Sequence, residues 1–289
     1  MAEQLPMIGF IGLGAMGAPM VRNLVAAGYM VWGFDLRQER LDATVADGAQ
    51  AAPDIAAVIA QADVLMTSLP SSQAFITVAE TELLPAIRPG QLVIDLGTTS
   101  VPKTRELAAR FAAQGAQLLD APVSGGPGGV AKRQLYMFLG GPAETVAACM
   151  PLFIAMGGAD RITHCGPVGC GQVVKGVNQL MMGLGNAAYL EALAFGVNAG
   201  VAAATIQQAI GATGRWRVDF NSTAGQVAGD EGNEVGVKFR ELPYFLEAAA
   251  ALGFPLPLTE QLYNFCDQGE RVVINDHRPA PSFWHELTG

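Results

Sequence analysis

The first half of the chain alternates short, continuous apolar runs with longer amphipathic segments. Continuous apolar runs are typical of strands buried on both faces, and helix-length segments between them indicate crossover connections. The pattern therefore predicts an α/β domain in which helices cover both faces of a parallel sheet. The expected strands are residues 7–11, 30–34, 64–68, 92–96, 117–120 and 135–140. The expected helices include residues 18–27, 55–61, 101–114 and 143–156.

The second half of the chain has a different sequence pattern. Strand-like runs disappear after about residue 165, and residues 168–200 are typical of one long helix that is apolar around most of its circumference. Such a helix must be buried, either between domains or against another subunit. We therefore predict an α/β domain over residues 1–166 and an all-α domain over residues 167–289, joined by a long buried helix.

Composition excludes several classes of protein. The formal net charge is −9 at pH 7 and no basic run occurs, which argues against a nucleic-acid partner. The least charged segment, residues 192–214, is interrupted by polar residues and glycines, so we expect a buried helix and no membrane span. The start lacks the features of a signal peptide, and the cysteines have no metal-binding spacing. We expect a cytoplasmic protein without a metal site.

A glycine motif follows the first expected strand. Gly12, Gly14 and Gly17 have the spacing G-x-G-x-x-G, directly before an expected helix. In dinucleotide sites these glycines make a tight turn, admit the pyrophosphate and allow close packing of the helix on the strand. The helix N-terminus then favours phosphate. The segment predicts a nucleotide site that includes Leu13, Ala15 and Met16; the alternative is a tight turn without a ligand.

An acid at the end of the second expected strand bears on the choice of nucleotide. Asp35 stands at about the distance expected for a residue that accepts hydrogen bonds from the ribose hydroxyls. A carboxylate there repels a 2′-phosphate, so NAD is preferred over NADP. Arg37 keeps NADP possible, because a nearby arginine accommodates that phosphate.

Polar loops follow two more expected strands, at residues 68–72 ("SLPSS") and 95–100 ("DLGTTS"). The carboxyl ends of parallel strands form the edge where open α/β sheets bind ligands. We therefore expect both loops to contact the nucleotide. The alternative is a pair of ordinary polar loops whose Ser and Thr cap helices.

The segment "DAPVSGGPGGV" (residues 120–130) is predicted to be a Gly- and Pro-rich loop after a strand. Ser124, Gly125 and Gly126 can offer a hydroxyl and adjacent backbone N–H groups to a carboxylate. An ordinary turn is the alternative.

Three polar residues share one face of the long helix. Lys175, Asn178 and Gln179 stand at positions i, i+3 and i+4 of a helix that is otherwise apolar. Burial favours the neutral form of a lysine, which suits a general acid–base. The alternative is a structural lysine whose stem reaches solvent.

Together these motifs resemble the β-hydroxyacid dehydrogenase family, which includes 3-hydroxyisobutyrate dehydrogenases and tartronate semialdehyde reductases. The resemblance rests on "GFIGLGAMGAPM", "DAPVSGG", "GCGQVVKGVNQ" and, more weakly, "FRELPYFLEAAAALGFPLP", and spans nearly the whole chain. It implies a Rossmann-like domain that binds NAD(P), a helical C-terminal domain like that of 6-phosphogluconate dehydrogenase, and a homodimer or homotetramer built through long-helix contacts.

The resemblance also implies roles for individual residues. Lys175 is the expected catalytic residue, exchanging a proton with the substrate oxygen while hydride passes between a small 3-hydroxy carboxylate and NAD(P). The substrate-binding residues that the resemblance implies are Ser124, Gly125, Gly126, Asn178 and Gln179. The further cofactor contacts are Leu69, Pro70, Thr98 and Arg240.

The chain departs from the family at several positions. Arg240 stands where the family often has a lysine, and Gln179 stands where many relatives have asparagine. Arg215, Trp216 and Arg217 fall where family members shape the distal substrate pocket. Two arginines there suit a substrate with a second anionic or polyhydroxylated end; surface arginines around a packed tryptophan are the alternative.

Two further functions stay open at this point. An imine reductase uses the same two-domain architecture but generally replaces the lysine, so Lys175 argues against it. A catalytically inactive protein that senses NAD(P) is the second alternative, and the motif around Ser124 together with Lys175 argues against that.

Overall fold

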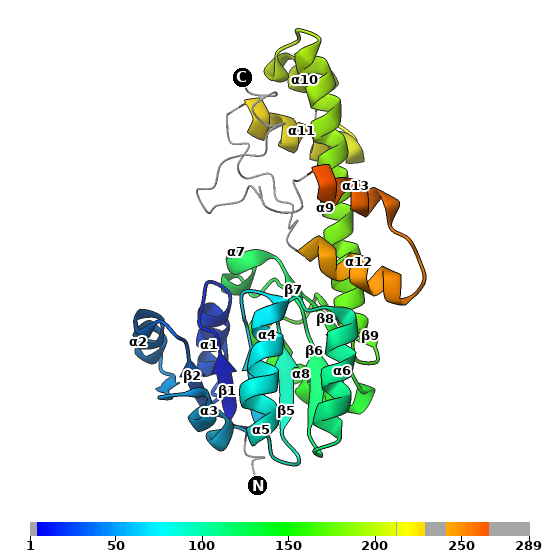
Figure 1. The fold of residues 1–289 in the computed structure, drawn as a ribbon. Coiled ribbons are helices and arrows are strands. Elements are labelled where there is room, and N and C mark those ends of the chain that lie inside the picture. Colours follow the sequence, from blue (N-terminus) through cyan, green and yellow to red (C-terminus); the bar gives the residue numbers. More distant parts are fainter. Residues whose placement is uncertain (1–4, 212, 229–240, 266–289) are drawn as a thin grey trace. The chain divides into compact units, whose positions relative to one another are not determined.

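A computed structural model describes residues 5–211, 213–228 and 241–265 of the chain. The chain divides into two units, Met1–Lys175 and Gly176–Gly289. Helix α9 (Cys170–Asn198) runs from the first unit into the second (Figure 1). The boundary that we expected near Gly166 stays a prediction.

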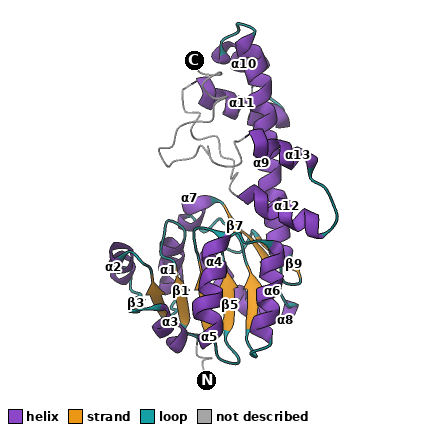
Figure 2. Ribbon diagram, viewed as in Figure 1, coloured by secondary structure: helices purple, strands orange, loops and turns teal. Residues whose placement is uncertain are grey.

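The first unit is built on a sheet with the strand order β3-β2-β1-β4-β5-β6-β8-β7, and β9 pairs with β8 (Figures 1 and 2). Strands β1 to β6 are parallel, and β8 runs antiparallel to β6. The predicted Rossmann-like sheet is confirmed, and its order reverses between β1 and β4. The strands are β1 (Ile8–Ile11), β2 (Val31–Phe34), β3 (Gln50–Ala51), β4 (Val64–Thr67), β5 (Leu92–Asp95), β6 (Gln117–Asp120), β7 (Val123–Ser124), β8 (Tyr136–Gly140) and β9 (Ile162–Gly166).

Two hydrophobic cores lie on the two faces of this sheet. Alternate residues of a central strand enter different cores: Met66 of β4 belongs to one and Leu65 to the other. One core receives Leu24 of α1 and Phe153 of α8, and the other receives Leu107 of α6. The helices of this unit are α1 (Gly17–Ala26), α2 (Gln38–Ala46), α3 (Ile55–Gln61), α4 (Ser72–Val78), η1 (Ala79–Leu83), α5 (Leu84–Ala86), α6 (Val101–Ala112), α7 (Gly126–Ala131) and α8 (Ala143–Gly157).

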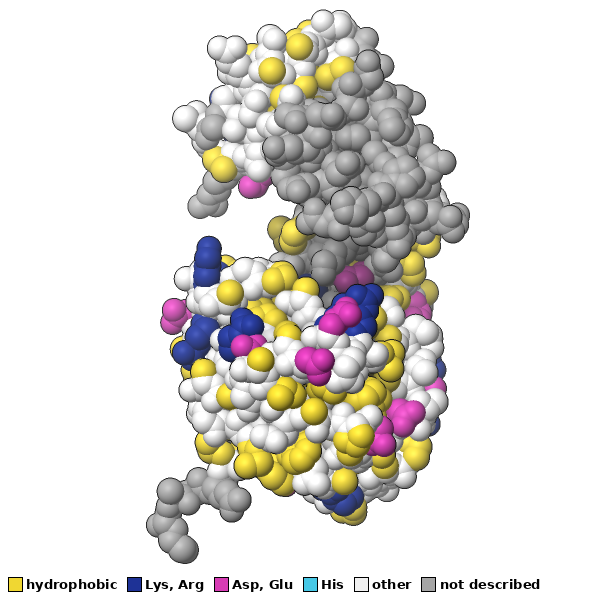
Figure 3. All heavy atoms as spheres, turned by 90° about the vertical axis from the view of Figure 1, so that its left-hand side faces the viewer, with side chains coloured by type: hydrophobic (Ala, Val, Ile, Leu, Met, Phe, Trp, Pro, Cys, Tyr) yellow, Lys and Arg dark blue, Asp and Glu magenta, His cyan; other side chains and the backbone are white. Residues whose placement is uncertain are grey.

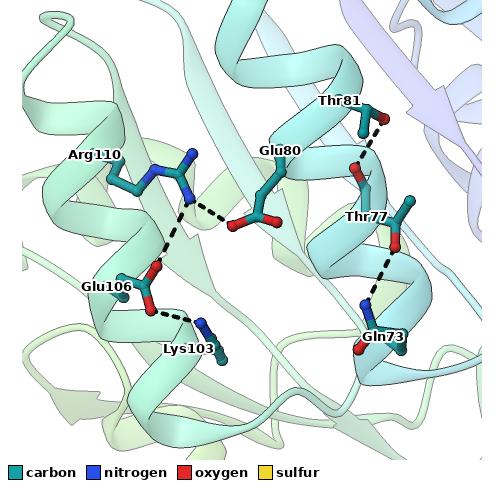
Figure 4. A network of polar contacts seen from close by, with 7 residues as sticks. All are labelled: Gln73, Thr77, Glu80, Thr81, Lys103, Glu106 and Arg110. Atoms are coloured by element: carbon teal, nitrogen blue, oxygen red, sulfur yellow. Dashed lines mark hydrogen bonds and ion pairs between the residues drawn. The ribbon is translucent and has the colours of Figure 1, made fainter.

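Ion pairs link two neighbouring helical segments on the surface (Figure 4). Arg110 of α6 pairs with Glu80 of η1 at 2.6 Å, and Lys103 pairs with Glu106 within α6 at 2.8 Å. These side chains are partly exposed, so solvent screens the pairs and they add little to stability. The network joins α6 to η1.

The expectation of a loop over residues 120–130 is partly wrong. Val123 and Ser124 form β7, and residues from Gly126 onward form the short helix α7. Proline in the first turn favours a helix start, and the Val130 side chain at the end of α7 is fully buried. Asn23 of α1 also donates to the Val130 carbonyl at 3.1 Å. Tertiary contacts therefore hold a glycine-rich segment that has low helix propensity.

The second unit is helical over its described residues. Its helices are the later part of α9, α10 (Ala203–Ile210), α11 (Arg215–Ala228), α12 (Leu242–Ala251) and α13 (Pro257–Phe265). Tyr189 of α9 packs edge-on against Phe220 of α11, with ring centroids 6.0 Å apart. Gly176 leaves room for Phe245 of α12, because an added Cβ would meet that ring at 2.9 Å. Small residues on α9 thus allow neighbouring helices to pack closely against it.

Helix α9 confirms the long helix expected over residues 168–200, but much of its apolar surface is exposed within one chain. Val173, Val177 and Met181 recur every fourth residue and all three are exposed. Among the described residues, α9 is long and apolar enough to cross a bilayer by length and composition alone. A helix that packs against another subunit can have the same length and composition. Burial against another subunit was one of the two alternatives expected for α9.

Candidate functional site

The turn between β1 and α1 needs glycine at two positions. Gly12 has φ +96°, and an added Cβ would overlap the Ser68 carbonyl oxygen in the loop after β4. At Gly17 an added Cβ would overlap the Gly12 carbonyl oxygen. The first and third glycines of the motif therefore allow close approach of backbone segments at the reversal of strand order.

The middle glycine has a different setting. An added Cβ at Gly14 would meet nothing closer than the Arg40 guanidinium, at 3.5 Å, so its face of the turn is open. The N-cap residue of α1, Met16, makes no side-chain hydrogen bond to the first turn. The N–H groups of a helix start attract phosphate. An open glycine beside such a helix start fits a pyrophosphate, so the residues present suit NAD(P).

The other residues of the expected nucleotide site lie along the same edge of the sheet. Leu13 is buried in the core, Ala15 is exposed and Met16 is half-buried. Leu69 and Pro70 follow β4, with Leu69 half-buried and Pro70 exposed. The Leu13 side chain is buried, whereas its backbone N–H donates to Asp35 at 2.8 Å.

Asp35 is tied to the glycine turn by hydrogen bonds. Its Oδ2 accepts from the Leu13 N–H at 2.8 Å and pairs with Arg40 at 3.4 Å, while its Oδ1 accepts from the Arg37 N–H at 2.9 Å. The Arg37 side chain is itself largely exposed. Lys and Arg side chains also gather, among acidic ones, toward the upper end of the α/β unit in Figure 3. Arg40 was not predicted from the sequence, although it stands only three residues after Arg37.

The structure brings Lys175 to the segment that contains Ser124. Lys175 is 3% exposed, and its Nζ donates to the Val123 carbonyl oxygen at 2.7 Å. The residues after Ser124 have positive φ, +128° at Gly125 and +62° at Gly126. An added Cβ at Gly126 would meet nothing within 4 Å, so the backbone there is open on that side. The buried Lys175 amine is thus hydrogen-bonded to the Val123 carbonyl, shortly before the open backbone of Gly126 in the chain.

The remaining predicted residues are placed as follows. Asn178 is half-buried and contacts Met182 within α9, whereas Gln179 is buried and its Oε1 has no hydrogen-bond partner among the described residues. Arg217 is exposed and donates to the Ile210 carbonyl at 3.4 Å. Arg240 lies outside the described residues. The side chains of Arg215 and Trp216 also lie outside the described part.

A buried acid at the end of β5, Asp95, was not predicted from the sequence as a site residue. Asp95 accepts hydrogen bonds from the Thr67 hydroxyl (3.0 Å), the Gly97 N–H (3.0 Å) and the Thr99 hydroxyl (2.6 Å). Burial raises the pKa of Asp95 to about 6, although these hydrogen bonds oppose the shift. Its partner in register on β6 is Asp120, so two carboxyl groups lie at the ends of adjacent strands.

Asp120 holds the start of α9. Its Oδ1 accepts from the Gly169 N–H at 2.7 Å and its Oδ2 from the Gln172 N–H at 2.8 Å. Burial raises the pKa of Asp120, and the backbone hydrogen bonds oppose that shift. The available signal was that expected strands at 92–96 and 117–120 both contain an aspartate at the carboxyl edge of the sheet.

Comparisons with known proteins agree with this geometry. A family model for the NAD-binding domain of 6-phosphogluconate dehydrogenase matches residues 7–166. A second, for the NAD-binding domain of NADP-dependent 3-hydroxyisobutyrate dehydrogenase, matches residues 169–277. The 2-(hydroxymethyl)glutarate dehydrogenase of Eubacterium barkeri is 33% identical, over 98% of this chain and 96% of that protein. The NAD-dependent L-serine dehydrogenase of Pseudomonas aeruginosa is 39% identical, over 73% and 72%.

Solved structures give the same result. The 3-hydroxyisobutyrate dehydrogenase of Mycobacterium tuberculosis, solved with L-serine, has a TM-score of 0.82 and 30% identity, covering 99% of this chain and all of that one. An imine reductase of Streptomyces aurantiacus has a TM-score of 0.63 at 20% identity, over 98% and 99% of the two chains, and shares the fold alone. The family models, the relatives and the fold lead to one conclusion: this chain belongs to the β-hydroxyacid dehydrogenase family.

Proposed function

We propose that this chain oxidises, or forms in reverse, a small carboxylate that carries a CH₂OH group on the carbon next to the carboxylate. The observation that carries the proposal is the buried Lys175 amine, whose Nζ donates to the Val123 carbonyl at 2.7 Å, directly before the Ser124–Gly126 segment in the chain. A proton-transferring amine beside an open carboxylate-binding backbone is what such a reaction needs.

Lys175 is the proposed general acid–base. In oxidation its neutral amine takes the proton from the substrate hydroxyl, and in reduction its ammonium returns a proton to the aldehyde oxygen. The Ser124 hydroxyl and the Gly125 and Gly126 N–H groups would hold the substrate carboxylate. A bound NAD or NADP supplies the hydride acceptor or donor. The turn at Gly12, Gly14 and Gly17 would hold the nucleotide.

The relatives narrow the substrate class. 3-Hydroxyisobutyrate, L-serine and 2-(hydroxymethyl)glutarate, the compounds in their names, share a carboxylate and a neighbouring carbon that bears CH₂OH. They differ in the second substituent of that carbon, which is a methyl, an ammonium or a carboxyethyl group. We infer that the substrate is a 3-hydroxypropanoate substituted at this carbon. Arg215 and Arg217 favour a second carboxylate, so 2-(hydroxymethyl)glutarate is the first compound to assay.

We propose NAD as the preferred cofactor. The Asp35 carboxylate stands at the end of β2 with only 8% of its side chain exposed, held by the Leu13 and Arg37 N–H groups. A carboxylate fixed there accepts ribose hydroxyls and repels a 2′-phosphate. Arg40 and Arg37 weaken that repulsion, so slower turnover with NADP is expected.

The test is a substrate and cofactor screen with matched lysine variants. We expect turnover of at least one of the three hydroxyacids, with a higher kcat/KM for NAD than for NADP. Lys175→Ala should lower kcat by about 10²- to 10⁴-fold, since general acid–base catalysis contributes that much. NADH affinity, measured by fluorescence, should stay within about twofold. Lys103→Ala, at a partly exposed ion pair on α6, should leave kcat unchanged.

The same screen separates the alternatives. NADH binding without turnover of any hydroxyacid would instead support a sensor of NAD(P). Reduction of cyclic imines that survives Lys175→Ala would support an imine reductase and contradict the role of Lys175.

We also propose that the chain works as a homodimer or homotetramer. The exposed apolar residues of α9 support this, because a contiguous exposed apolar surface marks an interaction site.

A further inference from the structure

Gln172 occupies an unusual position at the start of α9. It is 1% exposed, and its side-chain amide reaches the loop that follows β5. Its Nε2 donates to the Gly97 carbonyl at 2.9 Å, and its Oε1 accepts from the Thr99 N–H at 3.0 Å. The amide thus pairs with both backbone groups around Thr98, much as a neighbouring strand would.

The backbone of the same residue is held from another strand. The Gln172 N–H donates to Asp120 at 2.8 Å, at the end of β6. Space around that carboxylate is tight: an added Cβ at Gly140 would overlap Asp120, and one at Gly171 would overlap the Phe138 carbonyl oxygen. Gln172 therefore joins the loop after β5 to the end of β6 through three hydrogen bonds.

Lys175 follows Gln172 by one turn of α9. Residues three apart on a helix lie on neighbouring parts of one face, with an axial rise of about 4.5 Å. Gln172 is fixed to the Gly97–Thr99 loop, and Lys175 reaches the Val123 carbonyl at 2.7 Å. The first two turns of α9 thus contact the loop with Thr98 and the strand with Ser124.

The loop after β5 is also held by hydrogen bonds to Asp95. Asp95 accepts from the Gly97 N–H and from the Thr99 hydroxyl. The Gly97 carbonyl and the Thr99 N–H bond instead to Gln172. Among the described residues, these two groups join the loop to the helix that carries Lys175.

We propose that Gln172 is a positioning residue, which fixes the spacing between the Thr98 loop, expected to hold the nucleotide, and the Lys175 amine. The proposal rests on the proposed function, in which Lys175 transfers the proton and the loop contacts NAD(P). Gln172 acts by holding two groups whose mutual placement controls the rate. Loss of alignment of reacting groups by about 1 Å lowers rates by about a hundredfold.

The test replaces the amide but keeps the shape of the side chain. Gln172→Met retains an unbranched chain of similar length and removes both amide hydrogen bonds. We expect kcat to fall at least about tenfold while KM for the hydroxyacid changes less than about threefold. The pH midpoint of kcat should also move, because the surroundings of the Lys175 amine change.

The chain offers a closely matched control. Gln91 is 5% exposed and precedes β5 at the opposite end of the strand. Its Nε2 donates to the Ile59 and Ala62 carbonyls and its Oε1 accepts from the Arg88 N–H. Gln91→Met removes hydrogen bonds of the same kind from the same unit. It should lower thermal stability by a similar amount, yet keep the kcat and pH midpoint of the wild type.

Two measurements work without turnover: the Kd of NADH, by fluorescence, and the rate at which an amine-reactive reagent labels Lys175, by peptide mass spectrometry. Gln172→Met should change both, and Gln91→Met neither. If the two variants match in kcat, pH midpoint, Kd and labelling rate, the proposal is wrong while the proposed function stands. If the wild type turns over no hydroxyacid but Kd and labelling respond to Gln172→Met alone, the coupling stands and the function is wrong. If the methionine variant does not fold, the same measurements are made on Gln172→Glu, which keeps the side-chain length and one hydrogen-bond acceptor.

Discussion

Asp95 makes the stability of the first unit depend on pH. The carboxyl group is fully buried, and burial raises its pKa to about 6, above the value of 3.8 for a free side chain. The folded state therefore binds a proton more tightly than the unfolded state does. Where the native state holds the proton and the unfolded state has lost it, the free energy of unfolding falls as pH rises.

The prediction concerns the difference in free energy of unfolding between wild type and Asp95→Asn. That difference should fall as pH rises from about 4 to 7, by up to about 3 kcal/mol, and level off above the folded pKa. The introduced asparagine side chain keeps an acceptor for the Gly97 N–H, and the Thr99 hydroxyl can accept from its amide, so the variant should fold. Urea unfolding at several pH values measures it. A difference that stays constant, or grows with pH, would contradict the prediction.

Residues differ in how well the sequence reveals them. Asp35 and Lys175 were predicted because each stands at a fixed spacing within a local motif, either strand–turn–helix or one helix face. Asp95, Asp120 and Gln172 were not assigned roles, although all three lie in segments that were singled out. Each has a partner distant in sequence: Asp95 accepts from Thr67, and Gln172 contacts Thr99 and Asp120. The register of β5 and β6 brings Asp95 beside Asp120, and the packing of α9 against the sheet edge brings Gln172 to its partners.

At the scale of elements, the β1–α1 turn separates two uses of glycine. Gly17 is needed for packing, because an added Cβ would overlap the Gly12 carbonyl oxygen. Gly14 faces open space apart from Arg40, and its φ is not in the left-handed region. The structure therefore predicts that one alanine substitution damages the fold and the other damages ligand binding.

Gly14→Ala should leave the melting temperature within about 2 °C of the wild type but weaken NADH binding at least about tenfold, since the methyl group occupies the face open to a pyrophosphate. Gly17→Ala should lower the free energy of unfolding by more than about 2 kcal/mol, because backbone must move to admit the Cβ. Calorimetry and NADH fluorescence titration measure the two effects. Unchanged NADH affinity in Gly14→Ala would favour a tight turn without a ligand.

Elements with strong local patterns were predicted, and elements that depend on tertiary contacts were not. β1, β4 and β5 are fully buried and mostly apolar strands, so the sequence pattern predicts them directly. β9 is partly exposed and mixes polar with apolar residues, and it forms by pairing with β8. α7 has the sequence "GPGGVA" and depends on the burial of Val130. Propensity and pattern carry no signal for such segments.

At the scale of the whole molecule, α9 carries exposed apolar side chains along one side. Val177 is 53% exposed and Met181 is 73% exposed, at positions i and i+4, with Val173 one turn earlier. Contiguous exposed apolar surface is costly in water unless another surface covers it. A second copy of this chain is the proposed cover, as the family resemblance implies.

The last prediction tests that assembly. The wild type should sediment as a dimer or larger at micromolar concentration, and Val177→Glu with Met181→Glu should raise the dissociation constant at least about a hundredfold, since two charges would be buried at the interface. Leu252→Glu is the matched control: Leu252 is 72% exposed at the end of α12, and its replacement should leave the assembly unchanged. Circular dichroism checks that each variant keeps its helices. A monomeric wild type, or equal weakening by Leu252→Glu, would show that this side of α9 is not where two copies meet.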